Sequence, residues 1–185
     1  MTTVVQHSDV PANRNMLLNC LSPKEQQLFF DDCELVMLEF GTQLCHPSKP
    51  YQWLYFPLTG FISLIAKLPG HPPLEMGLIG FEGMLGATLV LQNRKVPLEA
   101  IVQGEGMAWR MPVVLFELFL NNNPALRSAL QRYLYHLLTQ LSSNAVCAHF
   151  HQIEERLARW LLMSHDRILH NELYLTHQFL AEMLG

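Results

Sequence analysis

One stretch near the C-terminal end determines the order of the structural elements: NPALRSALQRYLYHLLTQLSSNAVCAHF at residues 123–150, followed by HQIEERLARWLLM at residues 151–163. Asn123 and Pro124 favour a helix start, because asparagine is a good N-cap and proline fits the first helical turn. Apolar residues then recur every three or four positions, which predicts one long helix over residues 123–151. A second run of the same pattern begins at Ile153 and predicts another helix through Met163.

Within the long helix, six side chains fall at alternating spacings of four and three residues, the pattern of a seam between paired helices. They are Leu130, Leu134, Leu137, Leu141, Asn144 and Ala148. Other apolar residues lie on further faces, so the helix needs more than one partner. We predict that one face packs on the chain's own β domain and that the seam forms a homodimer interface. An ordinary buried helix in a monomer is the alternative.

The end of the chain predicts a short strand at residues 172–175 and a final helix that Thr176 caps. The segment THQFLAEMLG at residues 176–185 looks like the first helix and turn glycine of a helix-turn-helix. The second helix of such a motif contacts DNA bases, and we expect it after Gly185. Residues 152–185 are therefore expected to form an incomplete winged helix-turn-helix.

The first two thirds of the chain predict a β domain with short flanking helices. Residues 1–15 are polar and aperiodic, which predicts a flexible tail. Ser22 to Glu25 reads Ser-Pro-Lys-Glu, a capping box that begins a short helix. From residue 34 to 111 the apolar period is two and turn residues multiply, which favours an antiparallel sandwich or barrel. The expected strands cover residues 34–40, 52–56, 61–68, 74–80, 97–103 and 106–111, before a short helix at 112–120.

The composition is that of a packed, water-soluble domain. Of 185 residues, 50% are hydrophobic and 15% are charged, which excludes a wholly disordered chain. No apolar run reaches the ~20 residues of a membrane span, and no signal peptide is recognisable, so we expect a cytoplasmic protein without membrane contact. The net charge is −4, whereas a DNA-binding protein needs a basic face. Either DNA is not the partner, or the basic part lies beyond Gly185.

A barrel, a long helix and a helix-turn-helix start in this order resemble the Crp/Fnr family of bacterial transcription regulators. The resemblance covers about residues 17–185 and is most specific in the two helices from residue 123 to 158 and in residues 172–185. It implies an α+β fold with a cyclic-nucleotide-binding-like antiparallel β-barrel (a jelly-roll, or double-stranded β-helix). It also implies three parts: a sensory barrel at 16–122, a dimerisation helix at 123–151 and the DNA-binding start at 152–185.

In family members that sense cyclic nucleotides, the barrel carries a phosphate-binding cassette of a glycine, an acidic residue in a short helix, and an Arg-Ser pair. By resemblance, Gly80, Glu82 and Gly83 correspond to the first part, although Phe81 stands directly after the glycine. These three residues are candidate ligand-binding residues.

The second part of the cassette departs from the family pattern. Residues 93–100 contain no Arg-Ser pair, and Lys95 offers a single charge where an arginine would offer a fork. On the long helix only Ser142 matches the family's Thr-Ser pair. We therefore add Lys95 and Ser142 to the candidates and expect no response to cyclic AMP, while an unknown small-molecule effector stays open.

Other functions find little support in the sequence. The nine histidines and four cysteines show no metal-ligand spacing, and no nucleophile or phosphate-loop motif predicts an enzyme. We expect no cofactor. The resemblance implies that Thr176 and Gln178 contact the DNA backbone of a promoter in the full-length protein. The alternative is a stand-alone ligand-binding or interaction module without DNA activity.

Overall fold

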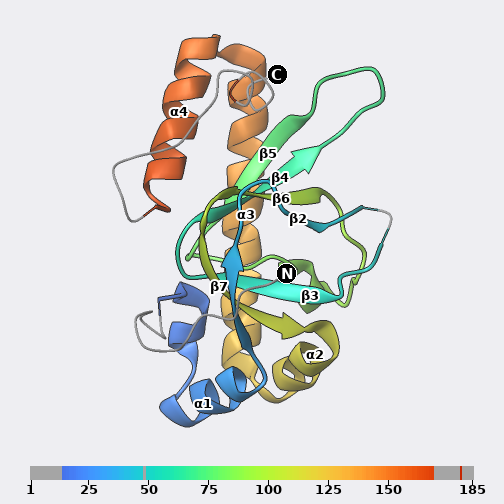
Figure 1. Ribbon diagram of the computed structural model, residues 1–185, viewed down its shortest axis with the longest axis vertical. Helices are drawn as coiled ribbons and strands as arrows, with labels where there is room; N and C mark the ends of the chain where they lie inside the picture. Colours follow the sequence, from blue (N-terminus) through green and yellow to red (C-terminus); the bar gives the residue numbers. More distant parts are fainter. Residues whose placement is uncertain (1–13, 48, 169–179, 181–185) are drawn as a thin grey trace.

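The computed structural model describes residues 14–47, 49–168 and 180 of the chain (Figure 1). Two short helices, η1 (Met16–Cys20) and α1 (Pro23–Asp31), precede the β domain, and a third, η2 (Ala87–Leu91), interrupts it. The strands are β1 (Glu34–Leu38), β2 (Gln43–Cys45), β3 (Trp53–Pro57), β4 (Phe61–Ala66), β5 (Leu74–Ile79), β6 (Glu99–Gly104) and β7 (Gly106–Pro112). Helices α2 (Val113–Asn122), α3 (Pro124–Phe150) and α4 (Ile153–His165) follow.

The strands form two antiparallel sheets, with the orders β1-β7-β3 and β2-β6-β4-β5. The predicted α+β fold with an antiparallel β domain is therefore confirmed as two sheets and a long C-terminal helix. Strand β2 was not predicted, because its three residues are exposed or half-buried and show no apolar alternation. The other strands lie within a few residues of their expected positions.

Helix α3 runs along the long axis of the molecule, with α1 and α2 towards one end and α4 at the other (Figure 1). The aromatic side chains of Phe29, Phe56 and Phe119 join α1, β3 and α2 near the first end. The ring centroids of Phe29 and Phe56 are 5.1 Å apart, and those of Phe29 and Phe119 are 5.3 Å apart. Both pairs meet edge to face, the arrangement that aromatic rings prefer.

The predicted capping box of α1 is confirmed, whereas Asn123 acts differently from the prediction. The hydroxyl of Ser22 accepts from the Glu25 backbone N–H, and the Glu25 carboxylate accepts from that of Ser22. The Asn123 side chain instead donates to the carbonyl of Phe119 at 2.7 Å. It therefore closes the end of α2 and does not cap α3 with its side chain.

The boundary of the N-terminal tail is also different from the prediction. Asn15, assigned to the tail, is fully buried. Its amide donates to the carbonyls of Pro57 and Gly83, and its side-chain oxygen accepts from the Leu17 backbone N–H. Asn15 thus ties the chain to two loops of the β domain and caps η1.

The predicted strand at 172–175 and the proposed DNA contacts Thr176 and Gln178 lie outside the described residues, and of the predicted helix from Thr176 only Leu180 is described, as helical. Within the described part, no helix combines the length and apolarity that crossing a bilayer requires. The same part contains no cluster of three or more His, Cys, Asp or Glu side chains suited to a metal ion.

The turn before β4 makes a specific demand on Gly60. Its φ of +71° lies in the left-handed region, and a Cβ there would overlap the carbonyl oxygens of Gly104 and Glu105. Gly70 has φ +80° with open space around it. We expect Gly70→Ala to lower the free energy of unfolding by about 1 kcal/mol, and Gly60→Ala to lower it by clearly more, because the backbone must also move. Urea denaturation measures both, and equal losses would contradict the role assigned to the close approach.

Candidate functional site

The residues predicted for the first part of the cassette form a tight corner at the end of β5. The carboxylate oxygen Oε1 of Glu82 accepts hydrogen bonds from Nε and Nη2 of Arg167, at 2.8 and 2.6 Å. The same oxygen accepts from the Gly80 backbone N–H at 3.1 Å. The remaining Arg167 nitrogen, Nη1, donates to the carbonyl of Met163 in α4 at 2.7 Å. The cassette acid is thus paired with an arginine that follows α4.

Both glycines of this corner allow a close approach of a side chain. A Cβ on Gly80 would stand 2.6 Å from Cγ of Arg167, and a Cβ on Gly83 would overlap the ring of Tyr133. Burial raises the pKa of the Tyr133 phenol, and the negative charge of Glu82 raises it further. A neutral phenol and an arginine therefore fill the space that these glycines leave.

The other two candidate ligand-binding residues lie elsewhere. Lys95 is exposed in the turn after η2, where its backbone N–H donates to the Asn93 side chain. Ser142 is exposed on α3 and lines a hollow of about 470 Å³ beside α4. The structure therefore brings Gly80, Glu82 and Gly83 together, and it does not bring Lys95 or Ser142 to them.

Two residues of the segment expected to replace the Arg-Ser pair, Val96 and Glu99, face inward, and neither side chain can donate to an anion. Val96 is buried in the main apolar core. The Glu99 carboxylate is also buried and lies 2.6 Å from the ammonium of Lys67. The main apolar core also contains the fully buried Met84 and Val102.

Most of the predicted dimer seam packs on the chain's own β domain within this protomer. Leu130 is fully buried in the core, and Leu134 and Leu137 pack against the same core. The Asn144 amide donates to the carbonyl of Met76 in β5 at 2.9 Å. Leu141 lies over Gly77 of the same strand, and only Ala148 of the six is exposed.

A different stripe of α3 is exposed to solvent. Four large apolar side chains near its C-terminal half are more than half exposed, although a helix of this apolarity needs a partner on each apolar face. They are Tyr135 (69%), Leu138 (61%), Val146 (56%) and Phe150 (72%). The spacing predicted apolar residues on more than one face of α3, and the exposed apolar face is one that the predicted seam does not include.

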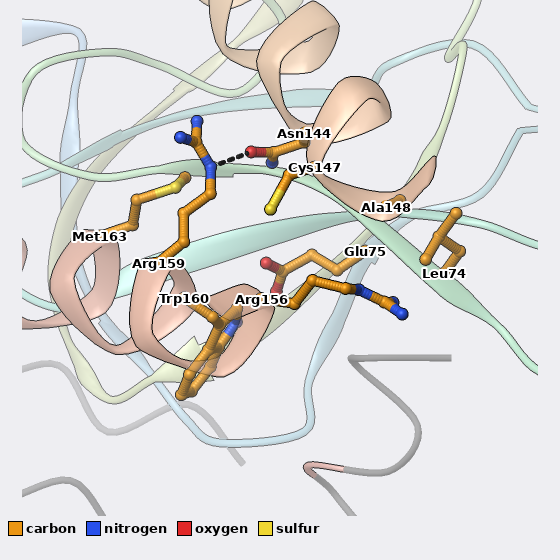
Figure 2. A pocket seen from close by; sticks show the side chains of 9 residues that line it. All are labelled: Leu74, Glu75, Asn144, Cys147, Ala148, Arg156, Arg159, Trp160 and Met163. Carbon is orange, nitrogen blue, oxygen red and sulfur yellow. Dashed lines mark hydrogen bonds between the residues drawn. The ribbon is translucent and has the colours of Figure 1, made fainter. Parts of the chain in front are cut away.

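A buried polar cluster where β5 meets α4 was not predicted. Glu75 lines a small cavity of about 50 Å³, and Figure 2 shows its carboxylate beside Arg156 and Trp160 of α4. The Ser63 hydroxyl lies 2.7 Å from Oε2 of Glu75 and also contacts the Gln103 side chain. A single glutamate in an alternating strand carries no sequence signal for this arrangement.

The environment of Glu75 changes its protonation. Burial raises the pKa of its carboxyl to about 7, while hydrogen bonds from Ser63 and Trp160 and the charge of Arg167 act in the opposite direction. At neutral pH the group is therefore close to half protonated, at the contact between the β domain and the helix that leads to the C-terminal region.

This raised pKa predicts a pH-dependent stability. Between about pH 5 and 7 the native state holds a proton that the unfolded chain has released, so the free energy of unfolding falls as the pH rises. The full shift corresponds to about 3 kcal/mol. Urea denaturation at several pH values should show this slope for the wild type and lose it in Glu75→Gln. The exposed Glu39→Gln is the matched control, and a Glu75→Gln slope equal to the wild-type slope would contradict the assignment.

No protein-family model and no curated protein matches the sequence. Solved structures do match. The match to a Eubacterium rectale protein assigned to the Crp/Fnr family of transcriptional regulators covers 94% of this chain and 81% of that protein's chain, at 14% identity and a TM-score of 0.74. The c-di-GMP-responsive global regulator CLP of Xanthomonas campestris covers 89% and 85%, at 19% identity and a TM-score of 0.64.

The catabolite activator protein of Thermus thermophilus is a third match, covering 91% of this chain and 79% of its own at 18% identity, with a TM-score of 0.57. All three matches extend over far more than the β domain. The chain therefore shares the fold of Crp/Fnr family regulators over most of its length.

Proposed function

We propose that this chain is the sensory and dimerisation part of a DNA-binding transcription regulator of the Crp/Fnr type, and that it does not respond to cyclic AMP. The observation that carries the proposal is the exposed apolar stripe of α3 on a fold shared with such regulators. The partners would be a second copy of the chain and, for the full-length protein, promoter DNA.

The exposed face of α3 supports a pairing of two α3 helices. Tyr135, Leu138, Ser142 and Ala145 follow each other at spacings of three and four, and each is exposed. These spacings are those of the predicted seam, with each position one residue later in the sequence. Because the inner face is already buried in the protomer, only the outer stripe is available to a second copy.

A dimer of this kind would act through the relative pose of its two DNA readers. Helix α4 follows α3 with only two residues between them, His151 and Gln152. A rotation between the two α3 helices would therefore move both α4 helices and whatever follows them. Readers on one duplex must match half-sites about 34 Å apart, so a small rotation suffices to change affinity.

The geometry of the cassette argues against a cyclic nucleotide. A nucleotide would need Glu82 for a ribose hydroxyl, but Arg167 occupies that carboxylate. Its phosphate would need cationic donors, but Lys95 is exposed in a turn and Val96 is buried in the apolar core. An effector of another kind has a hollow of about 370 Å³ available between η1 and α3, which Glu82, Arg132 and His136 border.

The dimer proposal predicts the effect of charges on the outer stripe. Leu138→Asp together with Val146→Asp should convert a dimer into a monomer, because four carboxylates would be buried near the two-fold axis, which costs several kcal/mol. Sedimentation velocity at tens of micromolar measures the change. Leu118→Asp is the matched control, because Leu118 on α2 is 59% exposed, nearly the same as the 61% of Leu138.

The control should sediment like the wild type. A wild-type chain that is already monomeric at this concentration would overturn the proposed interface. A dimer that survives the double substitution with its circular dichroism unchanged would do the same.

The DNA-binding proposal is tested with the full-length protein on a library of random duplexes. We expect enrichment of a two-part site with half-sites about one helical turn apart, lower affinity for that site in the Leu138→Asp, Val146→Asp variant, and no change on adding cyclic AMP. A stand-alone module without DNA activity would enrich no sequence. An affinity that rises with micromolar cyclic AMP would contradict the assignment of the cassette.

A further inference from the structure

We infer that the Glu82 corner is a guanidinium site, filled by the chain's own Arg167, and that this contact holds the end of α4 on the β domain. The inference goes beyond the proposed function, because it concerns the chain alone and holds whether or not the protein binds DNA. Its basis is the set of contacts that Arg167 makes and the chemistry of the groups around it.

All three guanidinium nitrogens of Arg167 are engaged. Nε and Nη2 donate to Oε1 of Glu82, and Nη1 donates to the carbonyl of Met163. The arginine side chain is only 11% exposed. A planar guanidinium offers donors in a fixed fork, and the carboxylate and the helix carbonyl accept on two sides of that fork. An arginine that merely lay on the surface would not bury its charge in this way.

The corner selects a cation by the groups that contact it. Glu82 and the carbonyl of Met163 are acceptors, and the Gly80 N–H is already directed at the carboxylate. A phosphate or carboxylate ligand would meet the Glu82 charge first. This is the reverse of a phosphate cradle, in which donors surround an anion.

The approach from solvent favours the internal arginine over a free cation. The hollow that borders the corner is also lined by Arg132 and His136 from α3. A dissolved cation would have to pass these groups and would lose translational entropy on binding, whereas the chain holds Arg167 near Glu82 at a high effective concentration. Arg167 therefore occupies the site, and any ligand that binds the Glu82 carboxylate must displace it.

The position of Arg167 gives the contact a mechanical consequence. Arg167 stands two residues after the end of α4, and its bond to Met163 spans the last turn of that helix. Trp160, one turn earlier, packs on Phe61 and Leu78 of the β domain. Trp160 and the hydrogen bond from Arg159 to Asn144 of α3 hold the earlier part of α4, so breaking the Glu82 contact removes the attachment nearest to the C-terminal end of the helix.

Hydrogen–deuterium exchange of α4 in the 185-residue chain tests the inference. Arg167→Ala should speed exchange at residues 160–165 about tenfold, the size expected for losing one buried charged hydrogen-bond network, while β3 and β7 keep their rates. Arg94→Ala is the matched control, because Arg94 also pairs with a glutamate, Glu117, but on an exposed surface away from α4. The control should leave α4 unchanged.

Chemical rescue separates a guanidinium site from a general packing role. Millimolar methylguanidinium should restore the α4 rates in Arg167→Ala and should fail to do so in Glu82→Gln, Arg167→Ala. Methylammonium at the same concentration should restore them less, because it lacks the fork. Arg167→Lys serves as a second variant if alanine lowers the melting temperature of the whole chain, and it should show partial protection.

Two results would overturn the inference. One is an α4 exchange rate in Arg167→Ala equal to that of the wild type. The other is rescue that is equally strong with and without the Glu82 carboxylate, since the site would then not be the one described.

Discussion

The rotation of α3 about its own axis is the constraint on which the rest of the molecule depends. Leu126 and Leu130 are fully buried between this helix and the β domain, and at packing density typical of protein interiors such leucines leave little freedom to turn. Once they are fixed, Leu138 is left exposed and Asn144 meets β5. The side-chain oxygen Oδ1 of Asn144 then accepts from Nε of Arg159 at 2.9 Å, so the orientation of α3 also fixes where α4 lies.

The same helix shows what periodicity can and cannot predict. Spacings of three and four predicted the helix, its approximate ends and the need for two partners. They could not decide which of two neighbouring stripes faces the β domain, because Leu137 of one stripe and Leu138 of the other are adjacent in the sequence and chemically identical. The choice depends on which stripe fits the sheets, and that fit is a property of the assembled core. The prediction that the Asn123 side chain caps α3 was wrong for a related reason, because its amide donates to the carbonyl of Phe119 in the preceding helix.

The candidate site was predictable only in its local part. Gly80, Glu82 and Gly83 belong to one short segment, so sequence spacing alone brought them together. Their principal partner, Arg167, stands 85 residues after Glu82 in the sequence, and nothing near it distinguishes it from an arginine on a solvated helix end. Glu75 could not be predicted for the same reason, because Trp160, which lines the same cavity and donates to its carboxylate, comes from α4. Long-range polar contacts leave no period in a sequence.

The junction with α4 differs from the rest of the molecule in the kind of interaction that stabilises it. The β domain and the first half of α3 share one large apolar core, whereas the separate apolar cluster under α4 has three buried members in the described residues, Phe61, Leu78 and Trp160. Hydrophobic stabilisation grows with the area removed from water, so the apolar contribution at this junction is the smaller one. Polar contacts of Glu75 and Arg167 add to it, and their strength varies with pH and salt. Segments with few buried apolar contacts open at the lowest free energy. The element that leads to the C-terminal region is therefore the one whose attachment a change in solution conditions, or a ligand near Glu82, can alter without disturbing the core.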